Sequence, residues 1–351
     1  MIRYCPGVDV SRDDAALLVN TVNTVGIMGA GVAKAIRLRF PAVMEPYKRA
    51  CDEGRLQPGG IQVLQLPTGQ TLINLASKQD WRDPSRNEWV GAGLVYLNRY
   101  LCERRPDIGS VALPPPGCGL GGLDWSRVHR MARTYLKPAL ARGVEIRLLA
   151  SEPAGIEDPV IYAGVGSRET PEPVLRLMQE IGAGLAAEGW WLRSGGAEGA
   201  DTAFWQGARL SQGKTEIFTA KARPEIPGSI LDIRDVHLRM MRSVHPAPDR
   251  LSSFAAKLMA RNGAQVFGLD FAMPSDLVLC WTKGGTGAGG TGQAIRLARS
   301  VGIPVLDLGA PEHATLSASG VIERAGDLVR AHRQEIGVSF PQRDAEAAPS
   351  I

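Results

Sequence analysis

The chain has 351 residues, of which 44% are hydrophobic and 22% are charged, and its formal net charge is +4. This length predicts two globular domains, and the absence of any apolar run near 18 residues excludes a membrane-spanning chain. The small charge permits nucleic-acid binding but does not argue for it. Five scattered cysteines without CxxC spacing, and no secretory signal pattern, predict a cytoplasmic protein without disulfides or a zinc site.

Strand-like and helix-like stretches alternate through residues 1–150. This rhythm predicts a mostly parallel sheet with helices on both faces, and ligands bind such sheets in the loops beyond the carboxyl ends of the strands. The predicted strands are Ala16–Val19, Ile61–Gln65, Thr71–Leu75, Ser110–Leu113 and Glu145–Leu149. The predicted helices are Gly31–Arg39, Pro41–Glu53, Asn87–Arg104 and Trp125–Ala141.

The stretch Leu18–Arg39 joins a strand, a glycine run and the start of a helix. Backbone N–H groups at such a turn are unpaired, and the helix dipole favours an anion there. A glycine turn alone is a weak signal, and this one matches neither GxGxxG nor the Walker A pattern. The amides of Asn20 and Asn23 strengthen the interpretation because they can bind a sugar hydroxyl without adding charge.

Two further loops follow predicted strands of the same sheet. They are Asn74–Arg86, with the sequence NLASKQDWRDPSR, and Pro114–Trp125, with the sequence PPPGCGLGGLDW. Prolines stiffen the entry of the second of these loops, and its glycines can wrap a diphosphate with backbone donors. Flexible surface loops are the alternative, which their position after strands disfavours. We expect Asp124 to cap the helix that follows.

Three of these features together resemble a macrodomain. They are the spacing Asp9–x10–Asn20–x2–Asn23, the run GIMGAGVA at residues 26–33 and the loop PPPGCGLGGLDW. The resemblance covers roughly the first 150 residues and is to the branch that removes ADP-ribose from nucleic acid, the antitoxin macrodomains of DarT–DarG pairs. It implies a macrodomain fold and an ADP-ribosyl glycohydrolase activity.

The resemblance also implies roles for individual residues. Asp9 would take the adenine amino group, although Val8 replaces the usual glycine, and Asn20 and Asn23 would lie near the distal ribose. The diphosphate would be held by Gly29, Gly31, Gly117, Cys118, Gly119, Leu120 and Gly121.

The catalytic candidates that the resemblance implies are Lys78 and Asn23. Macrodomains that cleave the ADP-ribose link carry a lysine in a (T/S)-K-x-x-W-R stretch, here Ser77–Arg82, and Asn23 would orient the distal ribose. A lysine can attack the anomeric carbon if its pKa is depressed, or stabilise a leaving base as a cation. Relatives that act on protein glutamates place an aspartate in a CGLD pattern where this chain has Gly121, which disfavours that mechanism. Trp81, Trp89 and Trp125 are each candidates for base stacking or for the core.

Residues 151–159 are polar, contain two prolines and are expected to be a linker to a second domain over residues 160–336. Alternation restarts there, with predicted strands Val160–Ala163, Trp190–Arg193, Asp276–Trp281 and Pro304–Leu306 and a predicted helix Pro171–Ala187. Glycine-rich turns follow the first three strands and form a composite nucleotide site. Its candidate ligand residues are Gly166, Ser167, Arg168, Ser194, Gly195, Gly196, Asp201, Gly285, Thr286, Gly290 and Thr291.

These motifs, GSRETP, SGGAEGADTAF and GGTGAGGTGQAIRLA, resemble the SLOG superfamily, the Rossmann-like group that includes DprA and the LOG nucleotide hydrolases. The resemblance covers about Val160–Leu308 and implies binding of a nucleotide or an NAD-derived ligand. The cleaving members carry a glutamate after their Gly-Gly-x-Gly-Thr turn, where this chain has Gln293 and Ala294. Binding is therefore expected rather than hydrolysis, together with a possible homo-oligomer formed through this domain.

Residues 222–275 depart from simple alternation and contain His237 and His245 without a partner cysteine, so a metal site is not expected. The amphipathic stretch Leu251–Met259 is either a lid over the second site or packing. Residues 337–351 are expected to be a disordered tail.

Two functions remain open from the sequence. The first is a glycohydrolase without a cofactor that removes ADP-ribose from a target, with a DNA base preferred over RNA or protein. The second is a binding module that sequesters ADP-ribose-type nucleotides without chemistry. A SLOG nucleotide hydrolase carrying the macrodomain as a targeting module is a third alternative, which the missing glutamate disfavours.

Overall fold

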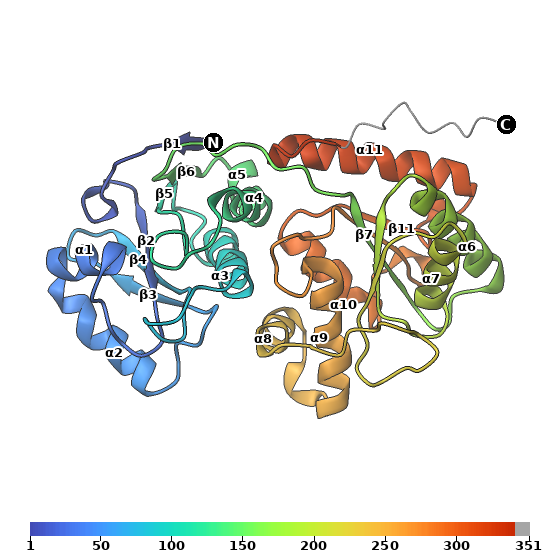
Figure 1. Ribbon diagram of the computed structural model, residues 1–351, viewed down its shortest axis with the longest axis horizontal. Helices are drawn as coiled ribbons and strands as arrows, with labels where there is room; N and C mark the ends of the chain where they lie inside the picture. The colour runs from blue at the N-terminus through green and yellow to red at the C-terminus, as the bar shows by residue number, and fades with distance from the viewer. Residues whose placement is uncertain (341–351) are drawn as a thin grey trace.

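A computed structural model describes residues 1–340, and it confirms the predicted fold class of two α/β domains. Figure 1 shows a sheet in each half of the molecule, with α1 and α2 at one outer side and α6 and α7 at the other. The helices α3 and α4 of the first half and α8, α9 and α10 of the second half lie between the two sheets.

The first sheet has the strand order β1-β6-β5-β2-β4-β3, and every pairing is parallel except that of β3 with β4. Its strands are β1 (Ile2–Tyr4), β2 (Leu17–Val22), β3 (Ile61–Gln65), β4 (Thr71–Ala76), β5 (Ser110–Leu113) and β6 (Glu145–Leu148). Its helices are α1 (Gly31–Arg39), α2 (Met44–Asp52), α3 (Asn87–Arg99), α4 (Trp125–Tyr135) and α5 (Lys137–Ala141).

Side chains that alternate between the two faces of β2 and its neighbouring strands produce the layers of this domain. Leu18 and Val22 lie in one apolar cluster with Ile36 of α1 and Tyr47 of α2. The odd-numbered neighbours, such as Val19, lie in another cluster with side chains of α3 and α4. Because successive strand residues point to opposite faces, each face of the sheet is covered by its own pair of helices.

The second sheet is entirely parallel, with the order β11-β10-β7-β8-β9. Its strands are β7 (Ile161–Gly166), β8 (Trp191–Ser194), β9 (Thr215–Ile217), β10 (Leu277–Trp281) and β11 (Val305–Asp307). Its helices are α6 (Glu172–Ala187), α7 (Ala200–Leu210), α8 (Asp235–Val244), α9 (Ser253–Phe267), α10 (Thr291–Ser300) and α11 (Ala318–Ile336).

Several elements differ from the sequence-based expectation. The short edge strands β1 and β9, of three residues each, and the helix α11 were not predicted. The predicted helix Asn87–Arg104 continues as a π-turn after Arg99, and the predicted helix Trp125–Ala141 is interrupted at Leu136. Pro138 explains that break, because proline lacks the N–H that would continue the helix.

The two domains share a core. The largest apolar cluster contains Val90 and Met131 of the first domain together with Val266, Phe267 and Val278 of the second. Because this apolar surface is buried between the domains, separating them would expose it to water at a free-energy cost. We therefore infer that the two domains unfold together.

The chain after α11 returns to the second domain before it leaves the described residues. Val338 is buried, and the ring of Phe340 packs edge-on against that of Trp190. Residues 337–340, which the sequence assigned to the tail, thus belong to the packed structure, and the rest of the predicted tail lies outside the described residues.

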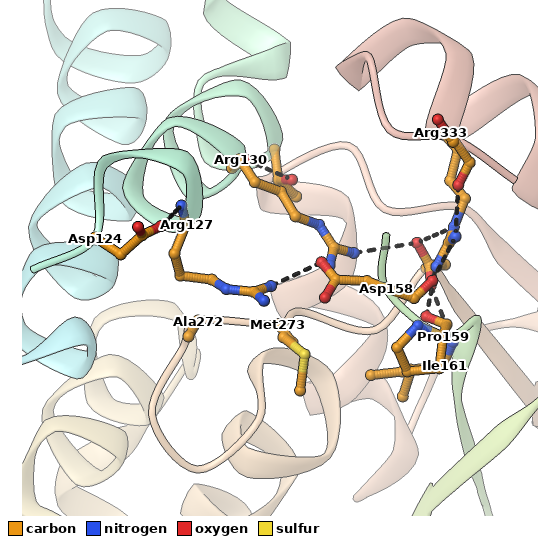
Figure 2. Close-up of polar contacts among 12 residues, drawn as sticks. Asp124, Arg127, Arg130, Asp158, Pro159, Ile161, Ala272, Met273 and Arg333 are labelled. Carbon is orange, nitrogen blue, oxygen red and sulfur yellow. Dashed lines mark hydrogen bonds and ion pairs between the residues drawn. The ribbon is translucent and has the colours of Figure 1, made fainter. Parts of the chain in front are cut away.

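A buried charge cluster lies beside the segment that joins the domains (Figure 2). Asp158 of this segment pairs with Arg127 at 2.7 Å and with Arg130, both on α4. Asp276 receives the Nε and Nη2 hydrogen bonds of Arg333 on α11, each at 2.9 Å, and lies 3.6 Å from Arg130. The segment predicted as a linker is therefore fixed at Asp158 to helices of both domains.

Two buried histidines make the folded state sensitive to acid. Burial lowers the pKa of His237 and of His332 to about 4, below the ordinary value of 6.5. Both are neutral when folded, whereas the unfolded chain binds protons below pH 6.5, so their contribution is present above pH 6.5 and is lost as the pH falls towards 4. We expect the free energy of unfolding to fall by about 3 kcal/mol per histidine over this range. Urea unfolding at pH 7 and pH 4.5 measures the difference in the free energy of unfolding between the two pH values. If this difference is unchanged in His237→Leu, His237 does not contribute to the acid sensitivity.

Candidate functional site

The first predicted loop is organised by the side chain of Asn23, which directly follows β2. Its Oδ1 accepts hydrogen bonds from the backbone N–H of Val25 at 3.1 Å and of Ile27 at 3.2 Å, and its Nδ2 donates to the Ile27 carbonyl at 2.6 Å. Tyr47 of α2 donates to the Asn23 carbonyl at 2.8 Å, and burial raises the pKa of Tyr47, so it stays a neutral donor. Asn23 therefore sets the path of the chain that leads to the glycines and α1.

The glycines Gly29 and Gly31 are exposed at the end of this loop, where α1 begins. Gly31 has a φ of +53°, a left-handed conformation that glycine adopts without strain. No side chain within residues 1–340 caps the N-terminus of α1. Its first amides therefore have no side-chain cap, as an anion site at this helix end requires, and binding of a diphosphate there stays a prediction.

The three predicted loops meet at Lys78. The Lys78 ammonium donates to the carbonyl of Leu120 at 2.8 Å, which joins the second loop to the third. Thr24 of the first loop donates to the Gln79 carbonyl through its backbone N–H and its hydroxyl, at 3.0 and 3.1 Å. The loops therefore form one connected surface at the carboxyl ends of β2, β4 and β5, with Lys78 half-buried in it.

Asn20 does not take the position that the sequence predicted for it. The predicted strand stopped at Val19, but β2 continues to Val22, so Asn20 lies inside the sheet opposite Asn74 of β4. It is fully buried and donates to the Asn74 side chain at 2.8 Å. Asn20 therefore holds β2 against β4 and has no exposed surface for a ribose.

Asp9 is exposed and already bonded within its own turn. Its Oδ1 accepts from the backbone N–H and the hydroxyl of Ser11, both at 2.9 Å. Contact with an adenine amino group through its other oxygen stays a prediction. Asp124 is confirmed as a cap, because it accepts the N–H of Arg127 at 2.8 Å in the first turn of α4.

The third loop depends on close contacts at Gly117 and Gly121. A β-carbon at Gly121 would lie 2.2 Å from the Gly117 carbonyl oxygen and 2.4 Å from the hydroxyl oxygen of Ser85. The loop is further held by the N–H of Ser85, which donates to the Gly121 carbonyl at 2.9 Å. Cys118 beside them is an unreactive thiol, because burial raises its pKa to about 12.

This geometry predicts that alanine substitutions at two glycines of the same loop differ in their effect on the melting temperature. Gly121→Ala must displace backbone and should lower the melting temperature, in line with about 1–3 kcal/mol for overpacking. Gly119→Ala is the matched control, because a β-carbon there meets nothing within 4 Å. Thermal unfolding of both variants tests this, and equal melting temperatures would contradict the contacts described.

Exposed apolar side chains lie on all three loops. Val25 and Ile27 belong to the first loop, Trp81 (52% exposed) to the second and Leu120 (76% exposed) to the third. The guanidinium of Arg82 lies 5.5 Å from the ring centre of Trp81. Trp89 and Trp125 are half-buried, so Trp81 is the tryptophan available for stacking among the three considered.

The second domain has a cavity of about 420 Å³ at the carboxyl ends of β7 and β10. Seven of the predicted residues line it, and all belong to the three glycine-rich turns: Gly166, Ser167, Arg168, Asp201, Thr286, Gly290 and Thr291. The predicted composite site therefore forms a real cavity, and its volume is typical of small-molecule sites.

Four predicted residues lie outside this cavity. Ser194 is the last residue of β8, is fully buried and donates to the Gly164 carbonyl at 2.7 Å. Gly285 packs against Ala310, and Gly196 faces Ile217 and Ile226, in each case where a β-carbon would clash. Gly195 lines a neighbouring cavity instead. These four residues shape the turns, whereas the seven above face the space between them.

Helix α9 contains most of the stretch Leu251–Met259, which was expected to be either a lid over the second site or packing, and it supplies a wall of the cavity. Met259, Arg261, Asn262 and Gln265 of this helix line it. Asn262 donates to the Gly290 carbonyl at 3.0 Å, which ties α9 to the third glycine turn. The amphipathic pattern in residues 251–259 was the available signal, and it could not show which turn the helix faces.

Asp201 and Arg261 form the charged centre of this site. The Arg261 guanidinium lies 3.7 Å from Asp201 and donates to the Gly195 carbonyl at 2.7 Å. Asp201 also accepts the backbone N–H groups of Gly166 and Ala197, each at 3.2 Å. Burial raises the pKa of Asp201 despite these donors. Asp201 therefore acts as an anchor for the first two turns.

Gln293, which was compared above with the glutamate of SLOG hydrolases, does not belong to the lining of the cavity. It is fully buried, donates to the Met241 carbonyl at 3.2 Å and accepts from Arg296 at 2.9 Å. Its amide is used for packing between α8 and α10.

Within the described residues, no group of three or more histidine, cysteine, aspartate or glutamate side chains is arranged to hold a metal ion. The same part of the chain contains no helix that is both long and apolar enough to cross a membrane.

A family model matches within the first domain. Residues 19–132 match the family model described as Macro domain. A DNA ADP-ribosyl glycohydrolase of Mycobacterium tuberculosis is 42% identical over 133 residues, which are 37% of this chain and 37% of that protein. One of Thermus aquaticus is 37% identical over 174 residues, which are 49% of this chain and 46% of that protein.

Among solved structures, the macrodomain of Mycobacterium tuberculosis DarG is 36% identical, with a TM-score of 0.40, and covers 43% of this chain and 99% of that chain. The chain thus spans less than half the length of the curated relatives it matches. The sequence comparisons support a macrodomain similar to that of DarG in the first half of the chain.

Proposed function

We propose that the first domain is an ADP-ribosyl glycohydrolase that releases ADP-ribose from a nucleic-acid base, thymidine in DNA being the preferred target. The relatives named DNA ADP-ribosyl glycohydrolase support this activity. The observation that carries it here is the position of Lys78, whose ammonium donates to the Leu120 carbonyl of the third loop, while its neighbour Gln79 accepts from Thr24 of the first loop.

Each loop would have a separate role in such a reaction. The open N-terminus of α1 and the glycines of the third loop would bind the diphosphate, and Asn23 would keep the first loop in place beside the distal ribose. Lys78 would either attack the anomeric carbon as a neutral amine or, as an ammonium cation, stabilise the leaving base. Water supplies a hydroxyl to the anomeric carbon and a proton to the base nitrogen, so the N-glycosidic bond is hydrolysed without a redox step.

The surroundings of Lys78 favour a nucleic-acid base over a protein glutamate as the group that carries the ADP-ribose. Gly121 stands where glutamate-directed relatives carry an aspartate, and the β-carbon of any other residue there would clash. Trp81 presents an exposed ring on the loop that carries Lys78, and an unpaired base can stack on such a ring.

A second candidate function is a module that binds ADP-ribose-type nucleotides without chemistry. The same Lys78 contact favours it, since an ammonium that donates to Leu120 can serve to hold two loops together.

For the second domain, we propose a SLOG-like fold that binds a nucleotide or an NAD-derived ligand in the cavity at the carboxyl ends of β7 and β10. The buried position of Gln293 supports binding rather than hydrolysis. Assembly through this domain and location in the cytoplasm stay predictions.

The test is incubation of the full chain with thymidine-ADP-ribosylated single-stranded DNA beside glutamate-ADP-ribosylated protein, with released ADP-ribose followed over time. We expect release from the DNA and little from the protein. No release from either substrate, with free ADP-ribose still bound, would favour the binding module.

A further inference from the structure

The proposed ligand cavity of the second domain adjoins a second compartment. A cavity of about 250 Å³ adjoins the first, and the two share Arg168, Ala197, Leu258 and Arg261 in their walls. About 300 Å³ is the lower end for a separate small-molecule site. The second compartment is therefore better described as an extension of the first than as a site of its own.

Each compartment contains a buried polar side chain without a partner. Gln265 is 1% exposed and lines the larger compartment, and neither its amide oxygen nor its amide nitrogen has a hydrogen-bond partner among the described residues. Thr219 is 2% exposed and lines the second compartment, and its hydroxyl also has no partner in that part of the chain. Buried polar groups are nearly always paired, so both groups point to a ligand.

Basic side chains line the whole length of this space. Arg168 and Arg261 stand between the compartments, and Lys221 and Arg223 line the second. The acids that line the two compartments are Glu169, Asp201 and Glu198, and Asp201 is bonded to backbone N–H groups and Arg261. Guanidinium groups bind phosphates through paired hydrogen bonds, so the position of Arg168 and Arg261 suits a phosphate chain.

We propose that the second domain binds a diphosphate-bridged ligand that fills both compartments. A nucleoside would lie in the larger compartment against Gln265, the diphosphate would pass Arg168 and Arg261, and a second hydroxyl-bearing or phosphate-bearing unit would reach Thr219, Lys221 and Arg223. This rests on the proposed nucleotide site and names its ligand class.

The ligand proposed for the second domain belongs to the same chemical class as the product proposed for the first domain. The reaction proposed for the first domain releases ADP-ribose, which is a nucleoside, a diphosphate and a second sugar in one molecule. The second domain would then bind the product class of the first.

The test titrates ADP-ribose and AMP into the full chain by calorimetry, with Thr219→Val and Gln265→Leu as variants. Valine keeps the shape of threonine and removes the hydroxyl, and binding to the first domain serves as the internal reference in each titration. For the wild type we expect two ADP-ribose molecules per chain. Thr219→Val should weaken the second-domain site for ADP-ribose about threefold to tenfold and leave AMP unchanged, in line with one lost hydrogen bond. Gln265→Leu should weaken both ligands there.

Two other outcomes would overturn the inference in different ways. If Gln265→Leu weakens both ligands and Thr219→Val weakens neither, a mononucleotide site exists without the second compartment. If one ADP-ribose binds per chain and neither variant changes any binding, the nucleotide site of the second domain is itself refuted. Melting temperatures equal to that of the wild type establish that both variants are folded.

Discussion

Replacement of Lys78 by alanine is expected to reduce release of ADP-ribose from modified DNA by about 100-fold to 1,000-fold, the range seen when one transition-state contact is lost. Binding of free ADP-ribose should remain, because the diphosphate contacts proposed above come from backbone groups of α1 and the third loop. Single-turnover release measures the first effect, and calorimetry with free ADP-ribose measures the second.

A second variant of Lys78 shows whether its charge or its nucleophilicity matters. Lys78→Arg keeps a cation near the Leu120 carbonyl but is not a nucleophile at neutral pH, so partial activity would indicate electrostatic stabilisation and complete loss would indicate attack by the amine. Lys214→Ala is the matched control, since Lys214 is exposed on the other domain, over the ring of Trp191. Full turnover in Lys78→Ala would remove Lys78 from the mechanism.

Substitution of Asp276 by asparagine should lower the free energy of unfolding by about 3–5 kcal/mol, because it leaves the buried guanidinium of Arg333 without its counter-charge. Asp276 is 1% exposed and pairs with Arg333, which is equally buried, and its Oδ2 also accepts the N–H of Ile161 at 2.9 Å. Asparagine keeps the size of the side chain and an acceptor for that N–H, so the change tests charge rather than packing. A loss of this size is a large part of the stability of a typical domain.

Asp327→Ala is the control for this substitution, since Asp327 pairs with Arg330 on the exposed side of α11 and should cost less than about 1 kcal/mol. Urea unfolding followed by tryptophan fluorescence measures both. Because the apolar core is shared between the domains, one transition is expected in each case. A similar small loss in both variants would show that the cluster in Figure 2 does little for stability.

Much of the fold could be predicted because its signals are local. The limits of β3, β5 and α1 were predicted to the residue, since turn residues bound the strands and Gly31 and Phe40–Pro41 bound the helix. Glycine-rich turns after predicted strands also identified both candidate sites, because parallel strands bring their carboxyl ends to one edge of a sheet. β1 and β9 were missed because three residues are too few to show a period.

Errors in strand ends became errors in site residues. β2 runs three residues beyond its predicted end, and β8 runs one residue further, so Asn20 and Ser194 lie inside sheets rather than in loops. A small error in a strand end changes the role of a residue, because the last side chain of a strand can be buried in the sheet while the next one is free to contact a ligand.

Period, turn chemistry and motif spacing are properties of neighbouring residues, so the α/β class of each domain, the glycines at the strand ends and the lysine in the second loop could be predicted from the chain alone. The tertiary structure decided which side chains share a space. It placed Lys78 against Leu120, α9 beside three glycine turns, and Asp158 and Asp276 among arginines of α4 and α11. These contacts join residues 28 to 57 positions apart in the chain, so no local pattern records them.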